Sequence, residues 1–423
     1  TKIMKKLLLI LLCLPFIGFG QQGWIKNFYD TPVDFPTVYN VVSTIDSGYA
    51  LFNYYGVIKT NALGDTIWTN QNYEGTKWGI QTYDGGYMLF RWFGLFKLDN
   101  LGSLQWSDSS IYVEPKTIDQ TIDSGYVYTG TAGGNLKADE YLRVVRTNSN
   151  GDTLWTCQPY PHNNTGGVDI KGTGNDVHQT SDGNYIVAGY RYSNTGGGIP
   201  GLDAAGVLSK INNAGDTLWT KVYLLGDESR FKSIFEKSNG NFVVAGFTRE
   251  FFPNYITCKD LLLAETDPQG NIIWVKTYES NCRAEAISIE EAHNGGFIVC
   301  GEKELNNGEE KIWVLRTNNF GDTLWTRTFG NPYGFGMSAK KTLDGGYIIT
   351  GPGYQNCFSA SIMLIKIDDN GNITSEFNIP ISSSNRKIKK TVDILGRETK
   401  PQPNIPFIEI YDDGTVEKRI VIE

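Results

Sequence analysis

The chain of 423 residues contains few of the side chains from which metal and disulfide sites are built. It has three histidines and six cysteines, and it contains no H-x-x-H, C-x-x-C or EF-type loop. The sequence therefore predicts no metal site and no cofactor. Six cysteines are also too few to hold together a scaffold of this length, so the fold needs an ordinary apolar core.

The chain also lacks excess positive charge and helical periodicity. Its 38 Lys and Arg against 46 Asp and Glu give a net charge of −8. The chain therefore lacks the excess of Lys and Arg that nucleic-acid-binding proteins carry, and its net charge argues against strongly anionic polysaccharides as main ligands. Aromatic residues make up 13% and there are 48 glycines, a mixture that favours many short strands joined by tight turns.

A step of the form Asp/Asn-x-Gly/Asn-aromatic occurs seven times, at spacings of 38 to 59 residues. Each copy precedes an apolar run that commonly ends in Gly, such as Tyr185–Gly189 (YIVAG). After a variable stretch comes an alternating run, such as Ile312–Asn318 (IWVLRTN), and then a turn with Gly. The seven steps are at Asp46–Tyr49, Asp84–Tyr87, Asp123–Tyr126, Asp182–Tyr185, Asn239–Phe242, Asn294–Phe297 and Asp344–Tyr347.

A tryptophan follows the Gly turn in six of the seven units. The run GDTLWT stands at Gly151–Thr156, Gly215–Thr220 and Gly321–Thr326, and Ser375 stands where the seventh unit would have its Trp. Equivalent copies suit packing between neighbouring units better than they suit six active sites. The six residues that we expect to be structural are Trp68, Trp106, Trp155, Trp219, Trp274 and Trp325.

Each unit predicts four short strands, named a to d in chain order. The Asp-Gly step joins strands a and b, and the second turn, whose Gly suits a left-handed conformation, joins strands c and d. Seven such units predict an all-β, seven-bladed β-propeller, with eight blades as the alternative. Trp24 begins a further d-like run, so we expect Trp24–Tyr29 to supply, or add to, the outer strand of the last blade.

The two ends of the chain predict three segments. Lys5 and Lys6 precede the apolar run Leu7–Phe19, which is typical of a secretory signal peptide cut near Gly20 and is short for a membrane span. The expected organisation is a signal peptide over residues 1–20, the propeller over residues 21–380 and a short β-rich tail over residues 381–423. No other stretch approaches transmembrane length, and we expect a monomer.

The tail carries DILGRE at Asp393–Glu398 and YDDGTVEKRIVIE at Tyr411–Glu423. These pieces resemble the C-terminal sorting domain of the type IX secretion system of Bacteroidetes, although the tail is shorter than that domain usually is. The resemblance implies export to the cell surface or the medium, with the secretion machinery as a partner. An ordinary small β tail is the alternative.

Two runs, Lys97–Trp106 and Glu265–Trp274, are similar to the blade-docking motifs of quinoprotein dehydrogenases, and the same turn resembles the Asp-box of sialidases. Both are packing motifs and imply a propeller without implying catalysis. Nearly the whole chain resembles secreted Bacteroidetes repeat proteins with DGGYIITG and GDTLWTK units, a resemblance that implies no defined activity.

Long loops are the places where a propeller usually builds a binding site. In a four-stranded meander the b–c and d–a loops share one face, and here the long ones are residues 158–175, 191–204 and 249–259, over adjacent blades. Their aromatic and basic side chains suit stacking on a sugar or gripping a peptide, or else pack within their own loops. The candidate binding residues are Tyr160, His162, Arg191, Tyr192, Phe251, Phe252 and Tyr255.

Three functions are compatible with this sequence. The preferred one is that of a secreted module that binds an extracellular glycan or protein. The sequence favours a non-enzyme over an enzyme. The alternatives are a polysaccharide hydrolase or lyase and a structural adhesin without a discrete ligand. Cys258 and Cys282 fall on the long-loop face, where they form a candidate disulfide.

Overall fold

The computed structural model of the protein describes most of the repeats and part of the C-terminal tail. The described residues are 23–28, 38–92, 94–109, 113–132, 141–160, 164–165, 168–194, 204–251, 257–278, 283–330, 335–356, 359–373, 388–393, 397–401, 407–411 and 416–419. They contain strands and turns and no helix, so no helix of the described part could cross a membrane.

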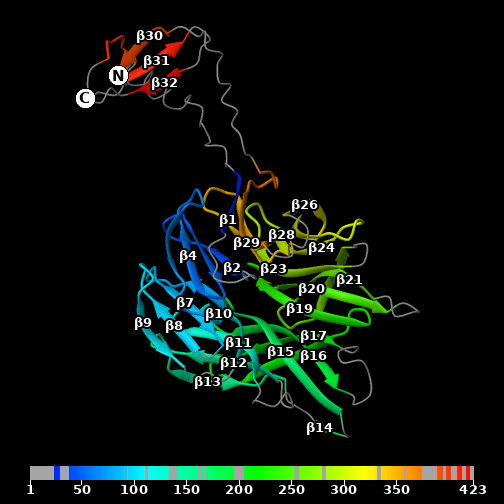
Figure 1. The fold of residues 1–423 in the computed structure, drawn as a ribbon. Coiled ribbons are helices and arrows are strands. Elements are labelled where there is room, and N and C mark those ends of the chain that lie inside the picture. Colours follow the sequence, from blue (N-terminus) through cyan, green and yellow to red (C-terminus); the bar gives the residue numbers. More distant parts are fainter. Residues whose placement is uncertain are drawn as a thin grey trace, which may run out of the picture. The chain divides into compact units, whose positions relative to one another are not determined.

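Seven antiparallel sheets follow one another around a ring in chain order (Figure 1). Each is a blade whose strands run from the axis outward, as the repeat predicts. The seven-bladed β-propeller is confirmed, and the eight-bladed alternative is wrong. Blade 4 has one extra short strand, β14 (Asn164–Thr165), beside its innermost strand.

The strands of the seven blades have the following bounds, from the innermost strand outward. Blade 1 has β2 (Val38–Ser43), β3 (Tyr49–Asn53), β4 (Gly56–Thr60) and β5 (Thr66–Asn70). Blade 2 has β6 (Thr76–Gln81), β7 (Tyr87–Arg91), β8 (Gly94–Leu98) and β9 (Leu104–Asp108). Blade 3 has β10 (Glu114–Gln120), β11 (Tyr126–Ala132), β12 (Tyr141–Thr147) and β13 (Thr153–Cys157). Blade 4 has β15 (Val168–Gln179), β16 (Tyr185–Asn194), β17 (Ala205–Ile211) and β18 (Thr217–Tyr223). Blade 5 has β19 (Glu228–Glu236), β20 (Phe242–Phe251), β21 (Thr257–Thr266) and β22 (Ile272–Tyr278). Blade 6 has β23 (Ala284–Glu291), β24 (Phe297–Glu304), β25 (Glu310–Thr317) and β26 (Thr323–Phe329). Blade 7 has β27 (Ser338–Lys341), β28 (Tyr347–Asn356), β29 (Ser359–Ile367) and β1 (Trp24–Phe28).

Blade 7 is assembled from both ends of the repeat region. Its outer strand β1 pairs antiparallel with β29, so that Trp24 lies opposite Lys366 and Phe28 lies opposite Ile362. The expectation that the N-terminal d-like run supplies the last outer strand is confirmed. The ring therefore closes by the pairing of β1 with β29.

The C-terminal part of the chain forms a separate unit, Thr374–Glu423. It contains a three-stranded sheet in the order β30 (Ile388–Asp393), β31 (Phe407–Tyr411) and β32 (Val416–Arg419). Val392 and Phe407 are its buried apolar residues among those described.

Burial explains why the strands differ in sequence. The two middle strands of a blade are covered on both faces by neighbouring blades, so they are buried along their length, as β17 is. The outer strands are more exposed, because one face is in water, and several of them alternate between exposed and half-buried residues, as β26 does.

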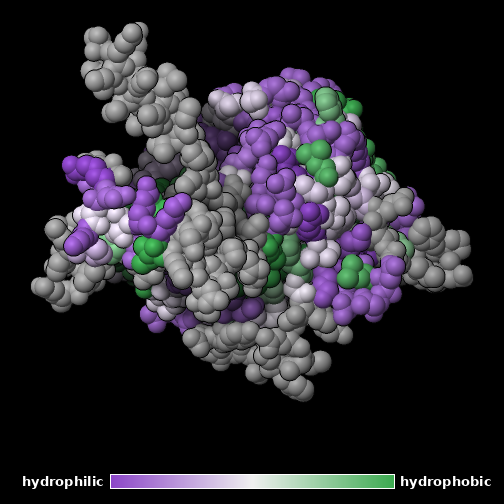
Figure 2. Space-filling view, turned by 90° about the horizontal axis from the view of Figure 1, so that it is seen from above, coloured by the Kyte–Doolittle hydropathy of each residue, from purple (hydrophilic) through white to green (hydrophobic). Residues whose placement is uncertain are grey.

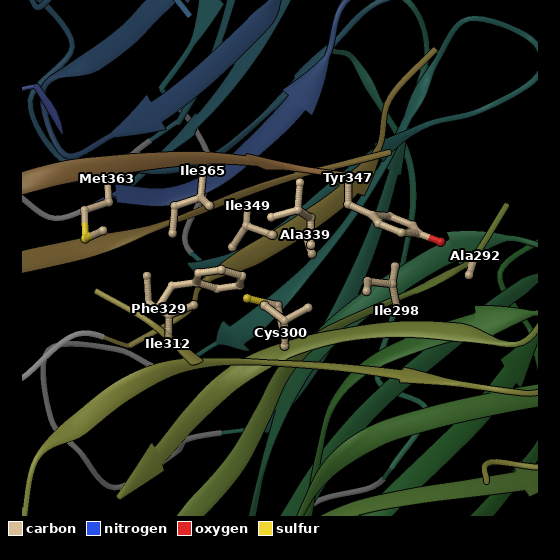
Figure 3. Close-up of a cluster of buried hydrophobic side chains, with 12 residues drawn as sticks. Ala292, Ile298, Cys300, Ile312, Phe329, Ala339, Tyr347, Ile349, Met363 and Ile365 are labelled. Atoms are coloured by element: carbon tan, nitrogen blue, oxygen red, sulfur yellow. The ribbon is translucent and has the colours of Figure 1, made fainter. Parts of the chain in front are cut away.

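The apolar core is divided into seven clusters, and each fills one interface between adjacent blades. Figure 3 shows the interface of blades 6 and 7, where Ile298 and Cys300 from one sheet face Ile349 and Ile365 from the other. Each interface is thus a small two-layer core, and stability is distributed around the ring.

Each outer-strand tryptophan lies against the c–d turn of the next blade. The Trp68 ring covers Gly102, and a methyl group added to Gly102 would lie 2.9 Å from it. The glycine also has φ of +83°, so only Gly satisfies both the backbone and the ring. The pairs, one for each interface, are Trp24–Gly64, Trp68–Gly102, Trp106–Gly151, Trp155–Gly215, Trp219–Gly270, Trp274–Gly321 and Trp325–Gly371.

Four of these tryptophans, Trp24, Trp68, Trp106 and Trp155, also pack against the aromatic residue of the a–b step in the next blade. Trp68 and Tyr87 pack edge to face, with ring centroids 5.6 Å apart, and Trp155 and Tyr185 do so at 5.3 Å. The indole N–H of Trp155 also donates to the backbone carbonyl of Asn213 at 3.0 Å. The two repeated motifs of the sequence are therefore the two halves of one contact between blades.

The aspartate of the a–b step has a separate role inside its own blade. It pairs with a buried cation near the end of strand c, as Asp84 does with Lys97 at 2.8 Å. Although burial opposes it, hydrogen bonds from Lys97, Thr82 and the Gly86 backbone lower the pKa of Asp84 to about 2. The equivalent pairs are Asp46–Lys59, Asp123–Arg146, Asp182–Lys210 and Asp344–Lys366.

Blade 5 contains the same interaction with its charges exchanged. Asn239 replaces the aspartate, Glu265 replaces the strand-c cation, and Lys237 binds Glu265 at 3.0 Å. Glu265 also accepts the indole N–H of Trp274 at 2.8 Å. In blade 5 the strand-c position thus carries the negative member of the pair, and its cation comes from the end of strand a.

Closure of the ring by β1 gives a first prediction. Replacing Trp24 with alanine removes the contacts of that ring with Tyr49 and Gly64, so we expect the free energy of unfolding to fall by roughly 3 kcal/mol. Guanidinium denaturation monitored by circular dichroism measures this change. Ile25→Ala is the matched control, because Ile25 is on the same strand and 40% exposed. Equal losses in the two variants would contradict the closing role.

Candidate functional site: the central channel

A cavity of about 370 Å³ lies where the innermost strands of all seven blades meet. Its wall is formed by side chains of β2, β6, β10, β15, β19, β23 and β27, together with Met337. This is the usual place for a site in a propeller, because it is concave and every blade contributes to it.

A repeated β-bulge aims the side chains into this cavity. In blades 1 to 6 the register of the innermost strand shifts by one residue, as it does between Thr76 and Trp78. The bulged residue and the next one then both line the channel. The lining pairs are Tyr39 and Asn40, Lys77 and Trp78, Lys116 and Thr117, Asn175 and Asp176, Lys232 and Ser233, Ile287 and Ser288, and Met337 and Ser338.

The bulge also explains the glycine that ends many of the apolar runs. In blades 3 to 6 a side chain at this position would collide with a backbone carbonyl oxygen of the innermost strand, and in blade 7 it would collide with that of Phe335 in the preceding loop. Blades 1 and 2 have Asn53 and Arg91 there, at the start of their short b–c turns. The bulge is thus a feature of the scaffold, whereas the side chains that it presents differ from blade to blade.

His178 links three blades beside the channel. Its Nδ1 lies 3.0 Å from Asp119 on β10, and its Nε2 lies 3.2 Å from Asp176 on its own strand. Asp176 in turn accepts hydrogen bonds from the Ser233 hydroxyl at 2.8 Å and the Ile234 amide at 3.0 Å, both on β19. With a carboxylate at each ring nitrogen, the imidazole is held as a cation.

Electrostatics accounts for this charge state. Burial opposes the charge of His178, but the carboxylates of Asp176 and Asp119 outweigh burial and raise the pKa of His178 to about 10. The pKa of Asp176 is lowered despite its own burial, chiefly by the charge of His178. Because both nitrogens carry protons that are donated to Asp, His178 has no lone pair with which to act as a general base.

The aromatic residues of the channel gather over blades 1 and 2. Tyr39, Trp78 and Lys77 line the cavity, and Trp92, from the b–c turn of blade 2, lies beside Lys77. The b–c turn of blade 1 is hydrogen-bonded to the loop that enters blade 2, through Tyr73 N to Tyr55 O and Gly75 N to Tyr54 O, each at 2.8 Å. The b–c and d–a connections therefore share one face here, as expected of a meander.

Figure 2 shows the molecule turned by 90° from the view of Figure 1. Hydrophilic residues predominate on this side, and hydrophobic residues are scattered among them.

The long-loop residues singled out in the sequence are described in part. Tyr160 follows β13, and Arg191 and Tyr192 are on β16. All three residues are half-buried. The Tyr192 ring stacks on that of Tyr190, with centroids 6.1 Å apart. Phe251 ends β20, but its side chain, together with His162, Phe252 and Tyr255, lies outside the described residues. A binding role for this set stays a prediction.

Sequence reasoning missed the aromatic and charged lining of blades 1 and 2. Lys77 and Trp78 are adjacent in the chain, and without the bulge they would point to opposite sides of the sheet. The signal that could have found them is the internal comparison of repeats. Aligned on the a–b step, the lining positions differ in residue type among blades, while the Trp, Gly and Asp positions repeat.

The described cysteines separate into two kinds. Cys157 and Cys300 are free and buried, and burial raises the pKa of both thiols. Cys258 is disulfide-bonded, and its partner lies outside the described residues. Lys259 and Arg283, each next to one of the predicted pair, form a β-bridge. The pairing of Cys258 with Cys282 stays a prediction, which non-reducing peptide mapping tests.

Among the described residues, no three His, Cys, Asp or Glu side chains gather in the manner of a metal site. No family model matches the sequence, and no curated protein matches it.

Solved structures match the fold. The Pan2 WD40 domain of Neurospora crassa has a TM-score of 0.50 and 9% identity, over 81% of this chain and 96% of that one. A protein of unknown function from Bacteroides caccae has a TM-score of 0.41 and 13% identity, over 70% and 94%. The extracellular domain of a two-component system protein of B. thetaiotaomicron has a TM-score of 0.48 and 10% identity, over 91% of this chain and 46% of that one. At these identities the likeness shows the β-propeller fold alone.

The charge state of His178 is a second prediction. We expect its imidazole to stay protonated through pH 8 and to titrate near pH 10, which NMR of the imidazole carbons can measure for a chain with three histidines. The pKa of His178 is higher in the folded protein than in the unfolded chain, so the charged imidazole stabilises the fold fully below about pH 6.5. This contribution to stability declines above pH 6.5 and is lost as the pH rises through 10. In His178→Gln this pH dependence should disappear. Titration of His178 near 6.5 would contradict the assignment.

Proposed function

We propose that this protein is an extracellular binding module that holds a glycan or protein ligand at the channel mouth on the face of the b–c and d–a connections. One observation carries the proposal: the repeats keep the same residues where blades touch, and differ where side chains line the channel. No two of the seven lining pairs are the same, although Lys recurs in blades 2, 3 and 5 and Ser recurs in blades 5, 6 and 7, and a wall without sevenfold symmetry can recognise an asymmetric ligand.

A binding role is favoured over catalysis by the chemistry of the lining. Both nitrogens of His178 are occupied, Asp176 is saturated by three partners, and Glu114 is paired with Lys116 at 3.0 Å. These groups are held in fixed pairs, and a hydrolase or lyase needs a carboxylate or imidazole that is free to exchange protons with substrate. The exposed ring of Trp92 and the half-buried Tyr39 suit stacking.

An array of glycans and peptides probed with the full chain tests this function. We expect a defined set of ligands to bind, and we expect Trp92→Ala to abolish their signal. The double variant Phe251→Ala, Phe252→Ala is the comparison, because it alters the long loop of blade 5. Loss of binding in that variant alone would move the site to the long loops. The absence of any specific ligand would favour a structural adhesin.

We further propose that the protein reaches the cell surface or the medium by the type IX route. The support is the DILGRE element and the final YDDGTVEKRIVIE run, within a C-terminal unit that is separate from the propeller. In a host that carries this machinery, deletion of residues 381–423 should leave the protein in the periplasm. Its appearance in the medium despite the deletion would contradict the proposal.

A further inference from the structure

Lys77 differs from the other lysines of the channel wall. Lys116, Lys232 and Lys340 each have a carboxylate within 3.1 Å, on Glu114, Glu285 and Glu290 in that order. Within the described part of the chain, the ammonium group of Lys77 has no carboxylate at ion-pair distance. It donates a hydrogen bond to the Tyr39 hydroxyl at 2.9 Å.

The Tyr39 hydroxyl and the Trp92 ring hold this ammonium group in place. Its nitrogen lies 2.9 Å from the Tyr39 hydroxyl oxygen and 4.9 Å from the centroid of the Trp92 ring. Contact with an aromatic ring stabilises a cation without neutralising it. Burial lowers the pKa of Lys77, and the charge of Glu114 opposes this shift. Lys77 is therefore a fixed positive group at the channel wall whose charge remains available to a ligand.

Trp92 provides an apolar face next to this charge. Its side chain is 41% exposed, and its ring lies over Gly75, where an added methyl group would be 3.3 Å from the indole. Its amide donates to the carbonyl of Gly75 at 3.2 Å, so the turn that carries the ring is anchored to the neighbouring loop. A ring fixed in this way can stack on the C–H face of a sugar.

The carboxylates nearby restrict the ligand further. Glu114 lines the cavity, and Glu74 is an exposed residue that accepts a hydrogen bond from Tyr54. Both can accept hydrogen bonds from hydroxyl groups, but both would repel a second negative charge. Among the described lysines that line the channel, Lys77 is the one without a carboxylate partner, and its charge beside these hydroxyl acceptors suits a ligand with a carboxylate and several hydroxyls better than an acidic peptide.

We propose that Lys77, Trp92 and Tyr39 form a subsite for one uronate residue of a saccharide, with the carboxylate on Lys77 and the sugar face on Trp92. This inference rests on the proposed binding function and names its ligand class. It agrees with the acidic net charge of the chain, because the subsite takes one uronate and does not attract a densely charged polymer.

The test compares two trisaccharides, one ending in glucuronate and one ending in glucose, by titration calorimetry with the full chain. We expect the glucuronate form to bind roughly 10- to 100-fold more tightly, the usual effect of a hydrogen bond to a charged group. Lys77→Met keeps the aliphatic stem and should abolish this preference. Trp92→Ala should weaken both saccharides equally. Lys276→Met is the matched control and should keep the preference, since Lys276 is a half-buried lysine on the outer strand β22 and does not line the channel.

Three outcomes would overturn the inference: equal binding of the two saccharides, a preference that survives Lys77→Met, or no binding of either. Tighter binding of a short peptide with one carboxylate would overturn it as well. The glycan and peptide array distinguishes failure of this inference from failure of the proposed binding function. If a different ligand binds through Trp92, the uronate subsite is wrong but the binding function still holds. If Lys77→Met unfolds at the same temperature as the unchanged protein, then its lost preference for the glucuronate form is not caused by a loss of folding.

Discussion

The contact of a tryptophan ring with a glycine of the next blade is the interaction on which the rest of this fold depends. It occurs at all seven interfaces, and each time the glycine has a positive φ and lies so close to the indole that a Cβ would collide with it. At four of these interfaces the same ring also packs against the aromatic residue of the neighbouring a–b step, so that one side chain contacts two turns of the adjacent sheet. Repetition of the tryptophan–glycine contact fixes the rotation from blade to blade.

Closure of the ring follows from the same contact. The seventh repeat has no tryptophan of its own at the d position, and without a partner β29 would present an unpaired edge. The strand that begins at Trp24 supplies both the missing pairing and the missing ring, which lies on Gly64 of blade 1. Because the chain runs from β1 of blade 7 directly to β2 of blade 1, the ring is closed where β1 pairs with β29 and where Trp24 meets Gly64.

The interior of the channel is free to vary because the outer parts of the blades carry the packing. Seven separate clusters hold the interfaces, and the Asp-to-cation pairs stabilise the blades from within. The bulge in the innermost strand then presents two consecutive side chains per blade to the axis. In this chain those positions gather aromatic residues and an unneutralised lysine over blades 1 and 2, and a locked Asp–His–Asp group over blades 3 and 4.

By itself, the sequence determined the all-β class, the seven blades and the closing role of Trp24, because short-range periodicity and turn chemistry encode them locally. It also indicated that the repeated tryptophans pack between blades. It did not reveal that the aspartate of each a–b step pairs with a strand-c cation, or that Lys77 and Trp78 both line the channel. Only the tertiary structure decided these points. The bulge breaks the alternation of the strand, and the residues that meet at the axis are far apart in the chain, so no local pattern could place Lys77 between Tyr39 and Trp92.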